Sequence, residues 1–408
     1  MRAYERLLKY VTYPTVSDPD CENCPSTPEQ LVFGKALVEE MLAMGISDAN
    51  IDENGYVFGT IPATKPDAKG PVIGFIAHLD VSQDAPCHPV KARIIENYDG
   101  GIIKLNDDII MDPGDFTSLK QYIGNDLIVS DGTTLLGCDN KNGIATILTM
   151  AEYFLQNPHI EHGTIKIGFT PDEEIARGAD RFDVKRFGAD FAYTVDGGEF
   201  GEVEYETFNA SSAIIKIKGV SMHPGVSKNK MKNASLIAME FADMLPKAEK
   251  PEHTDGYEGF YHLLNMSGVV EKAELNYILR DHDEEKLRER ERFVQRVAGY
   301  LIEKYGAGTV EVEIKQSYRN MECILRDHWH LIENAFKAVE QVGGAPISKP
   351  VRGGTDGSRL SFMGLPCPNL GTGGHNAHSR TEYASVQAMD KVVESLVALA
   401  ILYTDFVV

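Results

Sequence analysis

The chain has 408 residues, enough for about two or three domains and too many for a single small binding module. Its 40 Lys and Arg against 61 Asp and Glu give a net charge of −21, which repels nucleic-acid phosphates and anionic lipid surfaces. We therefore expect no nucleic-acid partner and no membrane partner. The N-terminal stretch M-R-A-Y-E-R-L-L-K-Y-V carries charges and lacks a signal-peptide core, so we expect a cytoplasmic protein.

The six cysteines are sparse for this length, and free thiols are expected in a reducing compartment. Cys21 and Cys24 form a C-x-x-C, which can be half of a zinc site or a redox pair. No second C-x-x-C completes four thiolate ligands. This motif therefore predicts an inert surface loop.

Residues 1–208 alternate helical and strand patterns, which indicates an α/β layer with a buried sheet. Thr27 and Pro28 predict the start of a helix that Gly45 ends. Strands are predicted at the apolar runs 71–77, 126–130, 164–169 and 191–195.

Residues 209–319 show a different pattern, with strands at 212–218, 260–268, 273–280 and 309–315 and helices at 234–245 and 283–305. The order β-α-β-β-α-β is the ferredoxin-like arrangement, so we expect an inserted α+β domain. Residues 320–408 then rejoin the first domain, with a helix from His328 to about Val342 capped by Asp327 and a final helix from Val386.

Polar side chains that can bind metal ions follow the predicted strands of the first domain. His78 and Asp80 follow the first strand, Asp139 lies in a turn before a helix, and two further strands lead to Glu173 with Glu174 and to Asp196. Ligands of open α/β sheets bind beyond the carboxyl ends of the strands. Each residue alone is weak evidence, but so many carboxylates at one sheet edge would repel one another unless cations neutralised them. The sequence therefore predicts a metal site.

A second histidine ligand is needed, and the segment G-G-H-N-A-H-S offers His375 and His378, between which the pattern does not decide. His328 and His330 are poor candidates, because positions i and i+2 of a helix point to nearly opposite sides. Arg352 can bind both oxygens of a substrate carboxylate; a phosphate loop is the competing interpretation, but no Lys-Ser/Thr follows the glycines.

Several motifs together give the sequence a family resemblance: H-L-D, G-C-D-N-K-N-G, T-P-D-E-E, T-V-D-G-G, M-H-P-G, R-G-G-T-D-G and G-G-H-N-A-H-S. In this order they resemble the M20 metallopeptidases, and among them the tripeptide aminopeptidases. The resemblance implies a zinc-peptidase-like catalytic domain with a mixed central sheet flanked by helices, formed by residues 1–208 and 320–408. It also implies that residues 209–319 form a lid and dimerisation domain.

The resemblance also implies a role for each site residue. It makes His78 and Asp196 ligands of one zinc ion, Glu174 and His378 ligands of a second, and Asp139 the carboxylate that bridges them. A cis peptide bond is expected between Asp139 and Asn140.

The catalytic groups implied by the resemblance are Glu173, Asp80 and His223. Glu173 is the general base for a metal-bridged water, and Asp80 orients His78. His223, in M-H-P-G, stabilises the oxyanion from the neighbouring subunit of a homodimer, although the motif alone favours a simple turn. Asn209 and Arg280 are further candidates for substrate contact, with a structural ion pair as the alternative for Arg280.

Three functions are compatible with these residues. The leading hypothesis is a di-zinc aminopeptidase that releases the N-terminal residue of tripeptides. The second is another M20-type metallohydrolase: a dipeptidase, a carboxypeptidase or an N-acyl amino-acid deacylase. The third is a metal-binding regulatory protein without turnover, which the presence of Glu173 and the whole ligand set disfavours.

Overall fold

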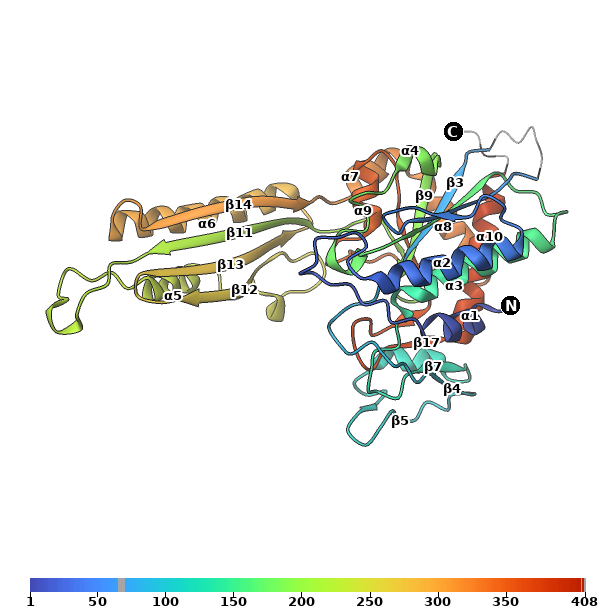
Figure 1. The fold of residues 1–408 in the computed structure, drawn as a ribbon, viewed down its shortest axis with the longest axis horizontal. Coiled ribbons are helices and arrows are strands. Elements are labelled where there is room, and N and C mark those ends of the chain that lie inside the picture. Colours follow the sequence, from blue (N-terminus) through green and yellow to red (C-terminus); the bar gives the residue numbers. More distant parts are fainter. Residues whose placement is uncertain (65–69, 405, 407–408) are drawn as a thin grey trace. The chain divides into compact units, whose positions relative to one another are not determined.

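The computed structural model describes residues 1–64, 70–404 and 406, which form two compact units. The first unit comprises Met1–Tyr205, Cys323–Lys349 and Thr355–Val408, and the second comprises Glu206–Glu322 and Pro350–Gly354 (Figure 1). The segment Pro350–Gly354, which the sequence analysis assigned to the first domain, lies in the second unit because its main chain pairs there, as between Val351 and Thr207.

A seven-stranded mixed sheet organises the first unit, with strand order β1-β2-β8-β3-β9-β15-β10. Strand β3 pairs in parallel with both β8 and β9, whereas β2 and β10 add antiparallel strands. The strands span β1 (Asn50–Ile51), β2 (Val57–Ile61), β3 (Ile73–His78), β8 (Ile165–Thr170), β9 (Phe191–Gly197), β10 (Val203–Glu204) and β15 (Asn369–Gly371). Every residue of β3 is buried, as its unbroken apolar run predicts.

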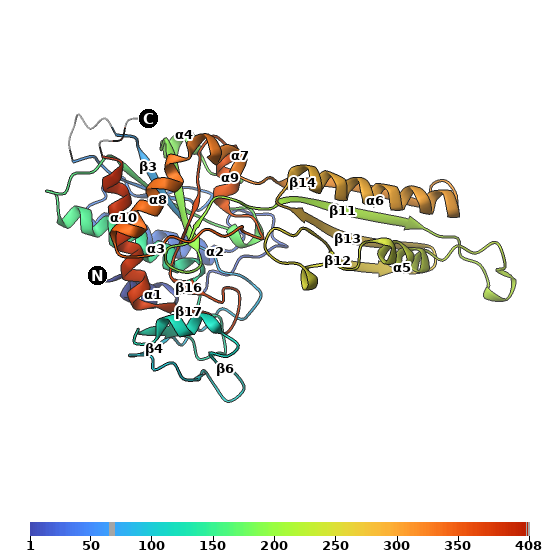
Figure 2. The ribbon, with the colours of Figure 1, turned by 180° about the vertical axis from the view of Figure 1, so that it is seen from behind.

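The longer helices of this unit are α1 (Ala3–Tyr10), α2 (Pro28–Met44), α3 (Cys138–Gln156), α8 (His330–Gln341) and α10 (Val386–Leu402), and of these α2, α3 and α8 pack on strands of this sheet. Helices α1, α3 and α10 lie side by side (Figure 2). Helix α2 ends at Gly45, whose φ of +104° favours glycine. Helix α3 packs so closely on β9 that a Cβ atom added at Gly143 would lie 2.0 Å from the Val195 carbonyl oxygen.

Two sequence predictions for this unit were wrong in detail. The predicted strand 126–130 is β7 (Leu127–Val129). It belongs to a second sheet, because its apolar side chains pack in a separate cluster with Tyr98 and Tyr383. Asp327 does not cap a helix, because α7 (Glu322–Leu325) continues through a 3-10 turn to Trp329, whose φ and ψ are already helical, and α8 starts at His330.

The remaining elements of the first unit are short. The second sheet contains β4 (Arg93–Ile95), β7, β16 (Gly374–His375) and β17 (Tyr383–Ser385). Strands β5 (Ile103–Lys104) and β6 (Ile110–Met111) form a hairpin, and α4 (Val184–Phe187) and α9 (Asp356–Phe362) are brief helices. Among the described residues, no helix has the length and apolar character needed to cross a membrane.

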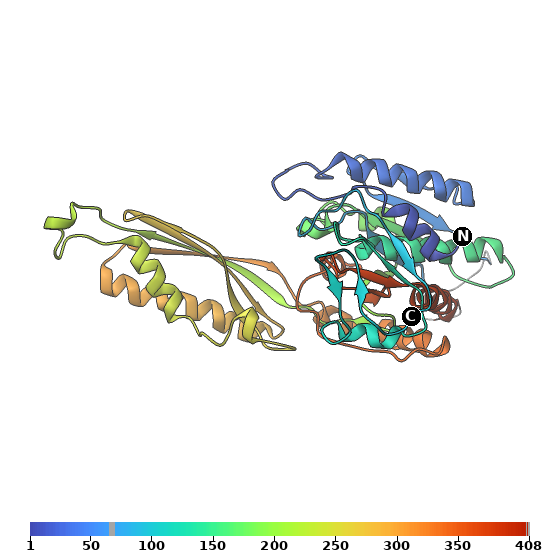
Figure 3. The same ribbon diagram turned by 90° about the horizontal axis from the view of Figure 1, so that it is seen from below.

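The second unit is an antiparallel sheet in the order β12-β13-β11-β14, with helices α5 and α6 on one face (Figure 3). Its elements are β11 (Asn209–Lys218), α5 (Ala234–Met244), β12 (Phe260–Gly268), β13 (Lys272–Asp281), α6 (Glu284–Tyr305) and β14 (Val310–Tyr318), in the β-α-β-β-α-β order. Helix α6 is capped by Asp283, whose side chain accepts a hydrogen bond from the Lys286 main chain. Ile215, Leu275, Phe241 and Leu301 belong to its core.

Candidate metal centre

The carboxyl ends of three neighbouring strands carry most of the predicted ligands. His78 ends β3, Glu173 and Glu174 follow β8, and Asp196 lies near the end of β9. Because β3 pairs in parallel with β8 and with β9, these ends meet at one edge of the sheet. Asp139 comes from a different element, the N-terminal turn of α3.

Asp139 lies between two histidines and directs a different oxygen to each. Its Oδ1 lies 3.0 Å from His78 Nε2, and its Oδ2 lies 3.5 Å from His378 Nε2. Each histidine also faces a carboxylate of its own: His78 Nε2 lies 3.2 Å from Asp196 Oδ1, and His378 Nε2 lies 2.8 Å from Glu174 Oε2. The centre therefore consists of two His-carboxylate pairs that share one carboxylate.

The residues present fit two metal ions. Tetrahedral zinc with bonds of about 2.0–2.1 Å separates neighbouring ligand atoms by about 3.3 Å, close to the four nitrogen-oxygen distances above. In the part of the chain that the structure describes, Glu174 Oε1 is buried without a hydrogen-bond partner. A buried carboxylate oxygen without a donor is costly unless a cation occupies the space beside it. His78 also forms compact groups with Glu173 and Asp196 and with Asp139 and Glu174.

Asp80 is fully buried and connects the ends of two strands. His78 Nδ1 lies 3.1 Å from the Asp80 carbonyl oxygen and 3.3 Å from its carboxylate. The Asp80 carboxylate accepts hydrogen bonds from the main-chain N–H groups of Glu173 and Glu174, both at 3.0 Å. Asp80 therefore orients His78 and also fixes the turn that carries the two glutamates.

The crowding of carboxylates shifts the proton affinities of the centre. Burial, followed by the charge of Asp196, holds the pKa of Glu173 well above its usual value. Burial raises the pKa of Glu174 to about 7 and that of Asp196 to about 6. Hydrogen bonds to Asp139 and Glu174 raise the pKa of His378 to about 11. Without a metal ion, bound protons supply the positive charge of this acidic cluster. The carboxylates therefore have raised pKa values and the imidazole is charged.

The choice between the two histidines of the G-G-H-N-A-H-S segment is decided by the local backbone. Asn376 and His378 have φ values of +56° and +64°, and the resulting turn directs His378 to Asp139. His378 Nδ1 lies 2.9 Å from Asp84 Oδ2. His375 instead lies 2.6 Å from the Tyr122 hydroxyl, stacks on Tyr383 and contacts no predicted ligand.

Two carboxylates of this centre were missed by the sequence analysis. Asp84 contacts His378, and Glu382 accepts hydrogen bonds from the main-chain N–H groups of Gly137 and Asp139. No motif or spacing identifies them, because both act on groups that are distant in the sequence. The peptide bond between Asp139 and Asn140 is cis, as expected.

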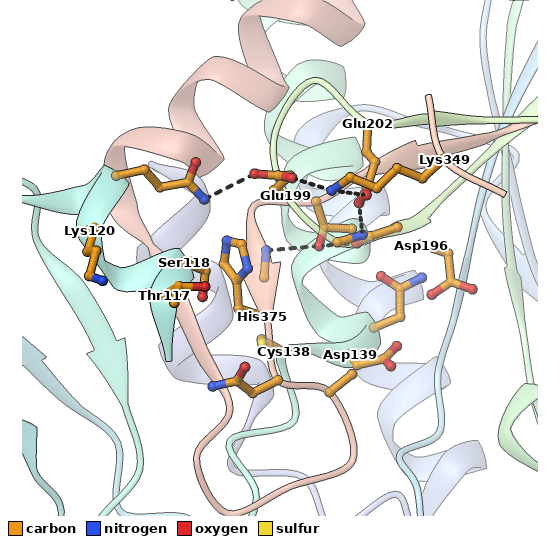
Figure 4. Close-up of a pocket in the computed structure, with 18 residues that line it drawn as sticks. Thr117, Ser118, Lys120, Cys138, Asp139, Asp196, Glu199, Glu202, Lys349 and His375 are labelled. Carbon is orange, nitrogen blue, oxygen red and sulfur yellow. Dashed lines mark hydrogen bonds and ion pairs between the residues drawn. The ribbon is translucent and has the colours of Figure 1, made fainter. Parts of the chain in front are cut away.

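A cavity of about 670 Å³ adjoins Asp139 and Asp196 (Figure 4). Glu199, Glu202 and Lys349 form a charged wall, in which Lys349 Nζ lies 2.7 Å from Glu199 Oε1 and 3.4 Å from Glu202 Oε1. The cavity therefore offers a small polar ligand access to the carboxylates of the centre.

Four predicted site residues lie in the second unit. Arg352 donates hydrogen bonds to the carbonyls of Gly256 and Glu258 and to Thr254 Oγ1. The other three form main-chain hydrogen bonds of their own unit, and they are Asn209, His223 and Arg280.

Comparisons with known proteins agree with this centre. The model of peptidase family M20/M25/M40 matches residues 125–401. Peptidase T from Caldanaerobacter subterraneus subsp. tengcongensis is 52% identical over 404 residues, covering 98% of each chain, and peptidase T from Bacillus velezensis is 49% identical over 403 residues with the same coverage.

Solved structures share the fold. The crystal structure of an aminopeptidase PepT from Bacillus cereus matches with a TM-score of 0.76 at 23% identity, covering 98% of this chain and 97% of that one. A dinuclear metal-binding M20 peptidase from Bacillus subtilis matches with a TM-score of 0.63 at 15% identity, covering 99% of each chain.

The chain therefore belongs to peptidase family M20/M25/M40, whose members are metal-dependent hydrolases. Within the family, its similarity over nearly its whole length to relatives named peptidase T makes it an aminopeptidase of that type. The predicted family and the predicted α/β fold class with a mixed central sheet are confirmed.

Metal affinity should depend steeply on pH. The raised pKa values of His378, Glu174 and Asp196 mean that the metal-free centre holds protons near pH 7, and a metal ion must displace them. Zinc binding must release at least the His378 proton, and below about pH 7 also that of Glu174, so zinc affinity measured against a competing chelator should rise about tenfold or more per unit between about pH 6 and 8. His375→Gln, outside the ligand set, should keep this slope. An affinity independent of pH would contradict the assignment of these residues.

Proposed function

We propose that this protein is a di-zinc aminopeptidase that releases the N-terminal residue from tripeptides. The observation that carries the proposal is the shared carboxylate, Asp139, which directs one oxygen to each of two His-carboxylate pairs. The relatives named peptidase T and a structural neighbour described as a tripeptidase from Staphylococcus aureus support the substrate class. The cavity beside Asp139 and Asp196 has room for an amino-acid residue.

In this proposal, His78 and Asp196 would hold one zinc ion, His378 and Glu174 would hold the other, and Asp139 would serve both. Nitrogen and carboxylate oxygen ligands suit zinc, and two ions at such a site polarise a peptide carbonyl and lower the pKa of water. Asp80 and Asp84, the acids beside His78 and His378, keep each imidazole in the orientation that leaves Nε2 for the metal.

Glu173 is the general base and then the general acid. It takes a proton from the attacking water and passes it to the nitrogen of the leaving dipeptide. Burial and the charge of Asp196 hold its pKa well above the usual value, which brings its proton affinity closer to that of the groups with which it exchanges protons. Its main chain is fixed by Asp80, so its side chain has a defined starting position.

Arg352 is the candidate group for the carboxylate of the substrate. Arg352 is fixed by hydrogen bonds to Gly256 and Glu258, and its guanidinium lies 5.1 Å from the centre of the Phe208 ring, so a peptide carboxylate meets a preoriented group. Asn209 and Arg280 remain weaker candidates. The Asn209 amide donates to the His282 carbonyl, and Arg280 donates to the Leu279 carbonyl, and these bonds favour structural roles.

His223 suits the stabilisation of an oxyanion. The Gly225 N–H donates to His223 Nδ1 at 3.2 Å, so in the neutral ring Nε2 carries the hydrogen and can donate it. We further propose that the chain forms a homodimer through the second unit, in which His223 serves the partner subunit. Edge strand β12 and helix α5 expose Leu264, Leu236 and Met239, each about 59–61% accessible, and such apolar surface is suited to a subunit interface.

The substrate class is tested with free and blocked tripeptides. The zinc-loaded protein should release the first residue of a free tripeptide such as Met-Gly-Gly, lose activity with a chelator and regain it with zinc. It should not cleave N-acetyl-Met-Gly-Gly, because an aminopeptidase requires the free amine. Equal hydrolysis of the acetylated peptide would favour a carboxypeptidase or a deacylase instead.

The role of the base is tested by Glu173→Gln, which keeps the shape of the side chain but removes its proton-accepting charge. We expect kcat to fall by about 10²–10⁴-fold, with both metal ions still bound and KM little changed. Glu394→Gln, at an exposed residue of α10, should leave kcat unchanged. An unaltered kcat in Glu173→Gln would disprove the role of Glu173 as the base.

The dimer is tested by mixing inactive variants. Separately, His223→Ala and Glu173→Gln should each lose most activity. If His223 serves the partner subunit, the random exchange of subunits should restore about a quarter of wild-type activity, since half of the dimers are mixed and each has one intact site. A monomer by sedimentation, or a mixture that stays inactive, would contradict this arrangement.

A further inference from the structure

Two buried carboxylates bind main-chain N–H groups beside the metal centre in the same way. Asp80, two residues after His78, accepts one N–H from Glu173 and one from Glu174. Glu382, four residues after His378, accepts the Gly137 N–H at 2.5 Å and the Asp139 N–H at 3.0 Å. Asp80 therefore joins the segment of His78 to the turn of Glu173 and Glu174. Glu382 joins the segment of His378 to the turn that carries Asp139.

The Glu382 interaction needs a carboxylate. Each of its two oxygens accepts one N–H, with Oε2 bound to Gly137 and Oε1 bound to Asp139. A glutamine would present one oxygen and one NH₂ group, so one hydrogen bond would become a contact between two donors. The side chain is 1% exposed and lies at the N-terminus of α3, where the helix dipole favours a negative charge.

The nearby buried Lys141 feels the charge of Glu382 but is hydrogen-bonded to another segment. The Lys141 Nζ donates at 2.7 Å to the Tyr13 carbonyl oxygen, which fixes that ammonium on a different segment. The Glu382 carboxylate is thus committed to the turn before Asp139. Glu382 and His378 lie in the same short segment. The bonds of Glu382 to Gly137 and Asp139 therefore hold the turn of Asp139 at a fixed position relative to His378.

We propose that Glu382 is a positioning residue of the metal centre, which holds the shared ligand Asp139 in place relative to His378 as Asp80 holds Glu173 and Glu174 relative to His78. The inference rests on the proposed metal centre. Glu382 acts through the main chain of Gly137 and Asp139, and its carboxylate also contacts the side chain of Cys138 between them.

The test measures metal binding by the full-length protein with a competing chromophoric chelator, and the absorption spectrum of bound Co²⁺. In Glu382→Gln, at least one of the two metal equivalents should bind about 10–100-fold more weakly, with an altered cobalt spectrum. Glu382→Asp keeps two acceptor oxygens on a shorter arm, so it should lose less affinity. Glu40→Gln, at a partly buried acid bonded to Arg6 and Lys9, should leave metal affinity unchanged.

The outcomes separate this inference from the proposed function. Wild-type protein that fails to bind two metal ions would overturn the proposed function itself. Wild-type binding of two ions, with unchanged affinity and cobalt spectrum in Glu382→Gln, would overturn only the role of Glu382, even if the variant unfolds at a lower temperature. If Glu382→Gln does not fold, Glu382→Asp is the variant to test. Metal affinity and a cobalt spectrum equal to those of the wild type in Glu382→Asp would then overturn the inference.

Discussion

The mutual repulsion of carboxylates around His78 is the constraint on which the site depends. The sheet edge and the start of α3 bring together five acidic side chains, Asp80, Asp139, Glu173, Glu174 and Asp196. In a poorly solvated site each close pair of like charges costs several kcal/mol, so this arrangement persists only with positive charge among the oxygens. Protons on the histidines supply part of it in the metal-free chain, and divalent ions supply it more completely.

Parallel strands and main-chain N–H groups hold the acidic side chains together in spite of this repulsion. Strands β8, β3 and β9 end together, so a histidine or carboxylate from each reaches the same place without a long flexible segment. Asp139 enters from α3, whose close contact with β9 at Gly143 leaves no space for a Cβ atom. Buried Asp80 and Glu382 then bind the N–H groups of the turns that carry the ligands. The catalytic geometry is therefore held mainly by the backbone rather than by side-chain packing.

The sequence placed histidines and carboxylates at this sheet edge better than it described their surroundings. His78, Glu174 and Asp196 were identified because each follows an apolar run of strand length. Such a run is a local property that the sequence displays directly. The choice of His378 over His375 follows from a turn with positive φ values, which residue types alone do not specify. Glu382 was missed because its partners are N–H groups, present at nearly every residue. The membership of 126–130 in a second sheet depends on long-range packing that an apolar run cannot express.

The measurement that addresses the two-metal centre most directly is anomalous X-ray diffraction from crystals of the zinc-loaded protein, collected on both sides of the zinc absorption edge. Two anomalous peaks should appear, one among His78, Asp196 and Asp139 and the other among His378, Glu174 and Asp139. A single peak, or two peaks without Asp139 between them, would contradict the shared-carboxylate centre from which the proposed function follows.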